Sequence, residues 1–414
     1  MVLGKAPDAL SQRRGASACD PLRWGPAQPL LTASGQEVYV ELIHSARLGQ
    51  RIVLFGDPVV VLLRSPNSGV FRPPRVQWVA GLLLDHRFRA HPIHLPPGFE
   101  QFIAPRVVTH PPGSVDVVWG SSSDTNNSPA SHVSALWHAR YDGDKWSTPE
   151  LLVRAGEIHW RAPTFAAAVR QGRRLHVVAP YYERATQDAG VLHIDGTTGA
   201  FSATRIRQRA LPGYATITGE NDGSLLVTFV ESELDSLPNG GHLYAIRSTD
   251  GGRTWSRPQL VHWSGAGMVR DVTILRGTPE TVLVWAEVSK GAFYPDSFRI
   301  ARTVDHGRHW TEFAALSAGG EFVGLQARDD RSSMVQVVMQ LIGDTSSLKY
   351  FRADGHGTID SLTLARDVSS LPRLIAVSPD TTMLIWGQHI RLASESKRAR
   401  AQFALRTRCP SPSR

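Results

Sequence analysis

Four arginines stand at the starts of strand-like segments, where a guanidinium group could bind an anion. They are Arg106, Arg161, Arg270 and Arg373. A guanidinium offers parallel N–H donors that match the two oxygens of a carboxylate. If one end of the fold gathers these strand starts, they predict a site for an anionic ligand. The structural alternative is that each arginine pairs with an acid or caps backbone carbonyls, because buried cations are rarely left unpaired.

Ionisable side chains also occur in the segments that follow the buried strands. Glu231 lies in one such segment, Glu287 and Tyr294 in another, and Asp188 in a third. A carboxyl group within hydrogen-bond reach of a leaving oxygen can act as a general acid. We expect Glu231 to join the ligand-binding arginines. Polar residues are also common in solvated loops, so an ordinary loop is the alternative for each of these residues.

Two short motifs indicate how the chain is built. Residues 248–255 and 303–310 both place Gly two residues after Asp and Trp five residues after it. An Asp carboxylate can accept turn N–H groups, Gly can take a positive φ, and Trp can bury a large ring on the returning strand. The motifs therefore predict structural hairpin turns, carried by Asp250, Gly252, Trp255, Asp305, Gly307 and Trp310.

The pattern Ser/Thr-x-Asp-x-Gly-x-Thr-Trp resembles the Asp-box, or BNR repeat, of sialidases and related β-propellers. Residues 248–255 match every defined position, whereas residues 303–310 carry His309 in place of Thr. The resemblance implies a propeller fold. It also implies that these turns lie away from the active site, because the box is a structural turn in that superfamily.

The same resemblance implies catalytic candidates. Trp160-Arg161-Ala162-Pro163 is similar to the Arg-Ile-Pro motif of sialidases, whose arginine belongs to a triad that grips the sialic-acid carboxylate. Asp188 stands near the position of the family's catalytic Asp. A sialidase also needs a tyrosine nucleophile activated by a glutamate, and Tyr294 with Glu287 could form such a pair. No motif ties these two residues together, so a catalytic and a non-catalytic propeller both stay open.

The chain repeats at a period of about 50 residues. Turn aspartates recur at intervals of 49 to 57 residues, at Asp85, Asp142, Asp195, Asp250, Asp305 and Asp354. Seven apolar segments recur with them, and helical periodicity is missing. Four short strands in about 50 residues make one propeller blade. We predict an all-β propeller with seven blades of about four antiparallel strands, and a six-bladed ring as in sialidases is the alternative.

The seventh repeat runs out after its third strand, so another part of the chain must supply the fourth. Residues 37–43 alternate between apolar and polar and have no repeat of their own. We expect them to pair with residues 401–406 and so remove the open edge. The predicted organisation is a loose arm at 1–35, one propeller domain at 36–408 with its closing strand at 36–44, and a tail at 409–414.

Composition excludes several classes of function. The formal net charge is +8, and the two ends carry all of it, so the body shows no nucleic-acid footprint. No apolar run is long enough for a membrane helix, and no Cys or His spacing predicts a metal site. No Gly-rich phosphate loop occurs, so no cofactor is predicted. No signal peptide is recognised, but a Cys19–Cys409 disulfide would imply export, which leaves the compartment open.

These observations favour a monomeric propeller that binds a glycan or another anionic small molecule in its central funnel. An active exo-glycosidase of the sialidase type is one alternative. A protein-interaction scaffold is another, because a fold does not determine a function.

Overall fold

The structure is a computed structural model. It describes residues 23–40, 44–63, 75–99, 103–110, 113–121, 135–154, 167–183, 188–197, 199–208, 211–220, 222–232, 241–265, 267–276, 280–329, 334–343, 345–354, 359–369, 371–378, 380–391 and 397–407. These residues form strands and no helix. The described part of the chain accordingly offers no helix that is long and apolar enough to cross a membrane.

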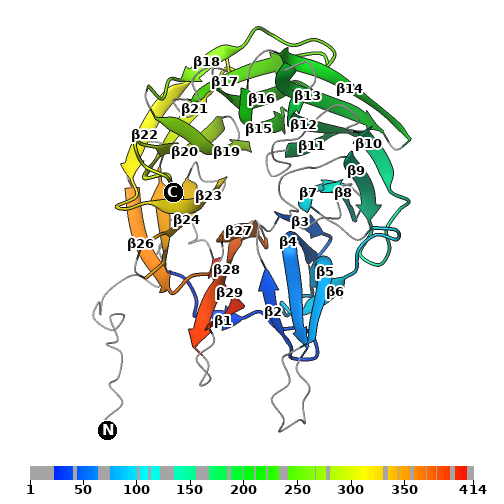
Figure 1. Cartoon of the computed structure of the whole chain (residues 1–414), viewed down its shortest axis with the longest axis vertical. Coiled ribbons are helices and arrows are strands. Elements are labelled where there is room, and N and C mark those ends of the chain that lie inside the picture. The colour runs from blue at the N-terminus through cyan, green and yellow to red at the C-terminus, as the bar shows by residue number, and fades with distance from the viewer. Residues whose placement is uncertain are drawn as a thin grey trace, which may run out of the picture.

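Seven antiparallel sheets surround a central axis as the blades of a propeller (Figure 1). Blade 1 contains β2 (Glu37–Val40), β3 (His44–Leu48), β4 (Arg51–Leu63), β5 (Arg75–Leu84) and β6 (Ala90–Ile93). Blade 2 contains β7 (Ile103–His110), β8 (Ser114–Ser121), β9 (Ala135–Tyr141) and β10 (Glu150–Arg154). Blade 3 contains β11 (Ala167–Gln171), β12 (Arg174–Glu183), β13 (Asp188–Thr197) and β14 (Ala200–Gln208).

The remaining blades follow the same order from the axis outward. Blade 4 contains β15 (Leu211–Gly219), β16 (Leu225–Ser232), β17 (Gly241–Ser248) and β18 (Gln259–His262). Blade 5 contains β19 (Met268–Arg276), β20 (Thr281–Val288), β21 (Ser297–Thr303) and β22 (Thr311–Ser317). Blade 6 contains β23 (Phe322–Asp329), β24 (Val335–Leu341), β25 (Ser347–Ala353) and β26 (Ile359–Arg366). Blade 7 contains β27 (Arg373–Ala376), β28 (Thr381–Arg391), β29 (Lys397–Thr407) and β1 (Gln28–Pro29). The prediction of seven blades is confirmed, and the six-bladed alternative is wrong.

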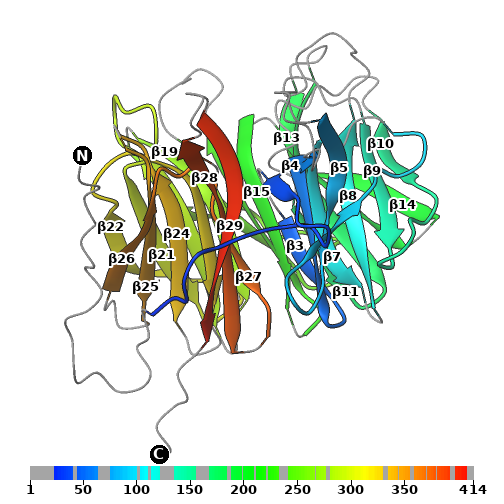
Figure 2. The same cartoon turned by 90° about the horizontal axis from the view of Figure 1, so that it is seen from below.

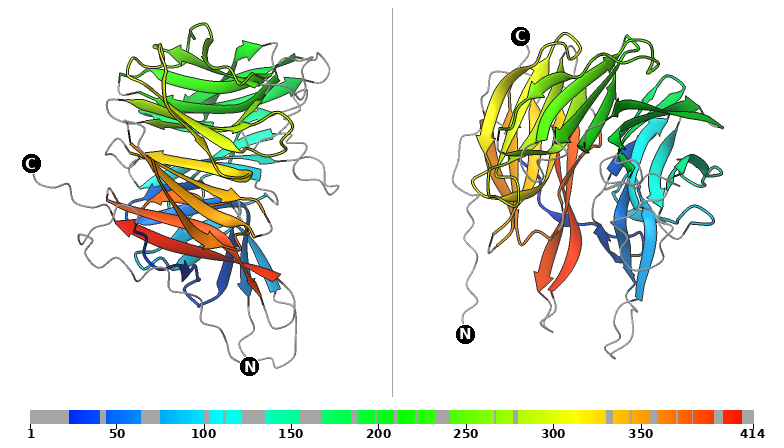
Figure 3. Two further views of the ribbon diagram at one scale, coloured as in Figure 1. Left: turned by 90° about the vertical axis from the view of Figure 1, so that its left-hand side faces the viewer. Right: turned by 45° about the horizontal axis from the view of Figure 1, so that its top comes forward.

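Neighbouring blades share apolar clusters, and this packing explains the apolar runs in the sequence. The second strand of a blade lies between two other strands and two other blades, so it is buried on both faces and reads as a continuous apolar run. Trp119 in β8 and Trp285 in β20 are almost fully buried for this reason. Seven clusters of buried side chains fill the seven junctions, one for each pair of neighbouring blades. The strands of each blade run roughly along the axis of the ring (Figures 2 and 3).

The ring closes through β1, which lies beside β29 in Figure 1. Gln28 pairs with Phe403, and the Leu30 N–H donates to the Ala401 carbonyl at 2.9 Å. Leu30 is fully buried in the cluster between blades 7 and 1. An N-terminal strand therefore completes the last blade and covers part of the outer edge of β29.

Two details of the predicted closure are wrong. Residues 37–40 form β2, which pairs with β4 in blade 1, and residues 41–43 lie outside the described residues. Residues 23–35 are not a loose arm either, because Trp24 packs edge-on against Tyr350 with ring centroids 5.4 Å apart. Alternation in residues 37–43 suits an innermost strand as well as an outermost one, whereas the two-residue β1 is too short to show a period.

The two Asp-Gly-Trp turns lie at the end of the ring where third strands finish. In the first, Oδ1 of Asp250 accepts the backbone N–H groups of Arg253 and Thr254 at 3.0 and 2.9 Å, and Oδ2 accepts the Thr254 hydroxyl at 2.6 Å. In the second, His309 takes the place of that threonine and binds Asp305 through both its backbone N–H and its ring.

The glycines in these turns pack closely against the preceding blade. Gly252 has φ +91°, and a Cβ there would lie 2.3 Å from the His193 ring in blade 3. Gly307 has φ +84°, and a Cβ there would lie 2.7 Å from Leu226 in blade 4. Only glycine fits both the backbone conformation and the space. Trp255 also meets His193, edge to face, at 5.1 Å between ring centroids. Each turn therefore helps to join two blades.

We predict that Leu30→Ala destabilises the protein by about 2–4 kcal/mol, because it empties a fully buried site in the closing junction. Urea unfolding would measure the change. Val304→Ala is the control, because Val304 is 69% exposed and should change stability by less than about 0.5 kcal/mol. Equal, small effects of the two substitutions would show that β1 does not close the ring.

We predict that Asp250→Ala lowers the thermal unfolding midpoint without weakening ligand binding, because two turn N–H groups lose their acceptor. Hydrogen bonds lower the pKa of Asp250, so its stabilisation should be present above about pH 4 and be lost as the pH falls through the lowered pKa. Calorimetry at several pH values tests this, with the exposed Asp380→Ala as control. Loss of ligand binding at an unchanged midpoint would contradict the structural role.

Candidate functional site

A central cavity of about 460 Å³ lies on the axis of the propeller, lined by the innermost strands and by residues that precede them. Its polar side chains come from different blades: His44 from blade 1, Arg106 from blade 2, Tyr214 from blade 4, Asp271 from blade 5 and Arg373 from blade 7. The lining begins near the starts of β7, β15, β19 and β23. The cavity therefore lies towards the end of the ring opposite the Asp-Gly-Trp turns.

Bulges in the innermost strands shape the wall of this cavity. The pairing register shifts in β7, β15, β19 and β23, each time within the first six residues of the strand. Three residues at these shifts have positive φ, Ala104 (+46°), Asp271 (+48°) and Gly324 (+64°). A bulge inserts an extra residue and re-aims the following side chains. A Cβ on Gly324 would lie 2.5 Å from Leu371, so close packing favours glycine at that position.

The cavity gathers positive charge. Arg106 donates through Nη1 to Nε2 of His44 at 2.5 Å, which requires a neutral imidazole. Burial, with the charges of Arg106 and Arg373, holds the pKa of His44 well below its usual value. Burial and the neighbouring Arg373 lower the pKa of Arg106 to about 9. Burial likewise lowers the pKa of Arg373 to about 10, although the charge of Asp271 opposes that shift. The charge of Arg373 thus disfavours the charge of Arg106.

Asp271 and Tyr214 form the second polar feature of the cavity. Burial raises the pKa of the Asp271 carboxyl, while the backbone of Leu325 and the two nearby arginines Arg270 and Arg373 oppose the shift. Burial and the Asp271 carboxylate raise the pKa of the Tyr214 hydroxyl, which hydrogen-bonds to the Asp271 backbone. A carboxyl group that keeps its proton can donate a hydrogen bond or a proton. The cavity therefore combines two guanidinium groups with a tyrosine hydroxyl and a carboxyl group whose pKa is raised.

The structure brings together two of the four predicted arginines. Arg106 and Arg373 line the cavity, whereas Arg270 extends towards the Phe293 carbonyl at 3.5 Å. The next residue, Asp271, lines the cavity in its place because the bulge in β19 falls between Arg270 and Thr273. Arg161 lies outside the described residues.

The predicted acids lie between blades and do not line the cavity. Glu231 binds the guanidinium of Arg207 from blade 3, with Nε at 2.8 Å and Nη2 at 2.5 Å. Glu287 binds Nε of Arg299 at 2.7 Å and also His262 from blade 4. The expectation that these acids sit beside the cavity arginines is therefore wrong: Glu231 pairs with Arg207 of the preceding blade, and Glu287 pairs with Arg299 of its own blade and contacts His262 of the preceding one.

The other catalytic candidates are not assembled into a site by the described residues. Asp188 is the first residue of β13, and its side chain lies outside what the structure describes. Tyr294 is 42% exposed on the loop between β20 and β21. No hydrogen bond joins Tyr294 to Glu287 among the described residues, because Glu287 faces Arg299 and His262. Cys19 and Cys409 also lie outside the described residues, so the disulfide stays a prediction. The described residues contain no cluster of metal-ligating side chains.

Sequence reasoning missed His44, Tyr214 and Asp271. A signal for two of them was present in the repeat. Arg106, Tyr214 and Asp271 are each the fourth residue of an innermost strand, so aligning the strands by position would have grouped them. Choosing only arginines at the strand starts concealed this shared register.

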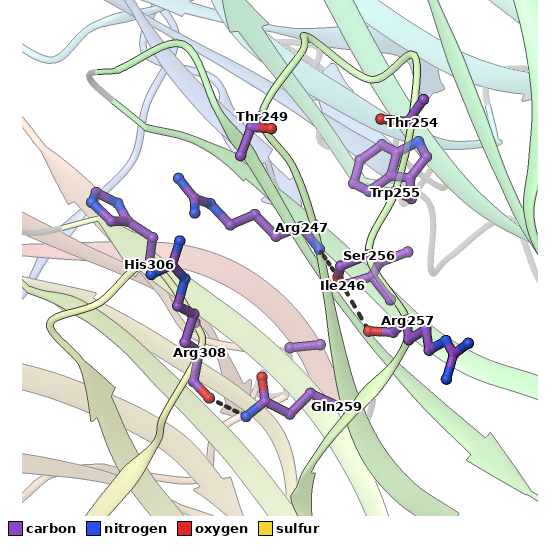
Figure 4. Close-up of a pocket in the computed structure, with 12 residues that line it drawn as sticks. Ile246, Arg247, Thr249, Thr254, Trp255, Ser256, Arg257, Gln259, His306 and Arg308 are labelled. Carbon is purple, nitrogen blue, oxygen red and sulfur yellow. Dashed lines mark hydrogen bonds between the residues drawn. The ribbon is translucent and has the colours of Figure 1, made fainter.

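A second hollow, of about 560 Å³, lies between the two Asp-Gly-Trp turns at the opposite end (Figure 4). Several of its polar groups already form hydrogen bonds or ion pairs within the protein. Arg247 binds Asp222 at 3.1 Å, and the Gln259 amide donates to the Arg308 carbonyl. Figure 4 shows the Arg257 side chain pointing away from His306. We therefore take the central cavity as the candidate functional site.

Comparisons with known proteins support the propeller fold and do not show a specific activity. No family model matches the chain, and no curated protein matches its sequence. An ulvan lyase of a new polysaccharide lyase family, bound to -[GlcA(1-4)Rha3S]-, aligns with a TM-score of 0.57 at 12% identity, covering 92% of this chain and 95% of that one. A Penicillium chrysogenum α-L-arabinanase complexed with arabinobiose aligns at 0.49 and 10% identity, covering 75% and 96%. A Trypanosoma rangeli sialidase in complex with sialic acid aligns at 0.45 and 11% identity, covering 91% and 59%. The chain is thus a propeller whose structural neighbours include carbohydrate-active enzymes.

Proposed function

We propose that the central cavity binds the carboxylate of an anionic glycan through Arg106 and Arg373. The observation that carries the proposal is that two buried guanidinium groups from different blades line one cavity, where the charge of Arg373 disfavours that of Arg106. Placing cations together in a buried site is costly, and an anion between them reverses that cost. A carboxylate suits the planar donors of both arginines.

The remaining polar side chains suit a sugar. The Tyr214 hydroxyl, and Asp271 in its neutral form, can donate hydrogen bonds to hydroxyl oxygens of the ring that carries the carboxylate. The ulvan lyase with a similar fold is bound to a glycan that contains GlcA and Rha3S, which are both anionic units. That likeness supports a glucuronate-type ligand, and a sialate-type ligand has the same carboxylate chemistry.

Cleavage of the bound glycan is a second candidate function, favoured by one observation. Asp271 lies in the cavity with a raised pKa, and the hydroxyl of Tyr214 contacts its backbone. A general acid needs a pKa near the working pH, and burial moves the pKa of the Asp271 carboxyl upward in that direction. Incubation with a fluorogenic sialoside and with an ulvan-type polymer tests this. Product release that Asp271→Asn abolishes would establish cleavage, and the absence of product with both substrates would leave binding alone.

We predict that Arg106→Ala and Arg373→Ala each weaken binding of an anionic glycan at least about 10-fold, the effect of losing one charge-assisted hydrogen bond. Isothermal titration with sialyllactose and with a GlcA–Rha3S oligosaccharide measures it, and neutral lactose should not bind. Arg106→Lys keeps the charge and should retain part of the affinity. Arg308→Ala, exposed at the opposite end, is the matched control. Unchanged affinity in both cavity variants, or no binding of either anionic probe, would refute the proposal.

We predict that the affinity for these probes falls as the pH rises above the usual carboxyl range of about 4, because Asp271 then becomes charged and repels the anion. The sign follows from the raised pKa: the neutral form persists to a higher pH than in the unfolded chain. The free energy of unfolding should fall over the same window, because the folded state holds this proton more tightly. Asp271→Asn stays neutral, so it should remove both dependences. Parallel pH profiles for wild type and variant would contradict this role of Asp271.

A further inference from the structure

Three large aromatic side chains are exposed at the end of the ring that holds the cavity. Trp263 is 69% exposed, Phe293 83% and Tyr294 42%. We call these three the rim aromatics. Exposed aromatic groups at one end of a fold mark interaction sites, because removing apolar surface from water lowers the free energy.

The pairing register places the rim aromatics at this end. Trp263 directly follows β18, whose last residue, His262, pairs with Leu243 near the start of β17. Phe293 and Tyr294 lie on the loop that leaves β20 after Val288, which pairs with Met268, the first residue of β19. Because β19 lines the cavity a few residues after its start, both loops stand on the side where the innermost strands begin.

The two loops lie against each other and against the cavity wall. A Cβ on Gly267, in the segment that follows Trp263, would lie 2.7 Å from the Val288 carbonyl, where the second loop begins. Nη1 of Arg270 lies 3.5 Å from the Phe293 carbonyl, and the next residue along the chain, Asp271, lines the cavity. The Phe293 backbone therefore lies next to a residue whose neighbour in the chain lines the cavity.

The loop that carries Phe293 and Tyr294 is held by backbone hydrogen bonds. The Asp296 N–H donates to Glu287 at 3.0 Å, and the Asp296 carbonyl accepts from Ala318 at 2.9 Å. The Pro295 carbonyl accepts from Phe322 at 2.8 Å. A loop whose backbone is held in this way loses less conformational entropy when a ligand covers it, which favours binding.

We propose that the rim aromatics are stacking subsites for further sugar units of a polysaccharide whose charged unit occupies the central cavity. This inference rests on the proposed function and specifies its ligand as a chain of sugars instead of a single terminal sugar. An aromatic ring face covers the apolar C–H face of a sugar, while the sugar's hydroxyl groups stay in water. Continuity with the cationic cavity is the reason to choose a glycan chain over a protein partner as the occupant.

The test is the dependence of affinity on chain length. Isothermal titration would compare a disaccharide and an octasaccharide prepared from the same GlcA–Rha3S polymer. We expect the wild-type protein to bind the octasaccharide at least about 10-fold more tightly than the disaccharide. The double variant Trp263→Ala/Phe293→Ala should lose this difference and keep the disaccharide affinity. Phe293→Trp should retain the difference, because it keeps an aromatic face.

The controls separate failure of the subsites from failure of the cavity. Val304→Ala removes an apolar side chain as exposed as Trp263, but on the Asp305 turn at the opposite end, and it should change neither affinity. Equal binding of the two lengths by the wild-type protein, or the same length effect in the double variant, would overturn the subsites while Arg106-dependent disaccharide binding stands. If the wild-type protein binds neither length, the proposed function itself is wrong and the subsites fail with it.

Discussion

Each blade must pack against its two neighbours all the way around the ring, and the rest of the structure depends on this contact. Apolar clusters fill all seven junctions. Hydrogen bonds and ion pairs between blades, which we call polar clamps, accompany several of these clusters. Fully buried Asp116 of blade 2 accepts from His138 at 2.9 Å and from Arg170 of blade 3 at 2.6 Å, and these bonds hold its pKa at about 2. A buried carboxylate is tolerated only where it is paired, so such clamps also fix which blade faces which.

This packing is what allows polar groups to converge on the axis. The innermost strands of successive blades contact one another around the ring, so their starts form a fixed rim. Bulges near those starts then direct Arg106 and Asp271 into one cavity. Burying two guanidinium groups together costs stability, and a scaffold with seven apolar junctions can tolerate that cost. The site therefore has the features of a preorganised anion-binding site.

The sequence predicts the period, the blade number and the turn geometry well, because each depends on local patterns. The residue types of Asp250 and Gly252 are enough to predict their turn. Closure was predicted from the missing strand, but β1 is too short to carry a period and only packing of Leu30 reveals it. Arg106 and Arg373 were found from their places at strand starts. Asp271 was not, because a one-residue bulge decides whether Arg270 or its neighbour faces the axis, and no local pattern encodes that choice.

The cavity is positively charged because the acids that were expected beside its arginines lie elsewhere. Glu231 and Glu287 stand at the ends of second strands, on the side where the innermost strands begin, yet Arg207 of the preceding blade holds the first and Arg299 and His262 hold the second. Among the described residues that line the cavity, Asp271 is the one acid, and burial favours its neutral form. The clamps thus hold these carboxylates at the blade junctions, where they do not neutralise the arginines of the cavity. The same arrangement of charged residues therefore does two things: its carboxylates help to join the blades, and its cavity arginines would select an anion.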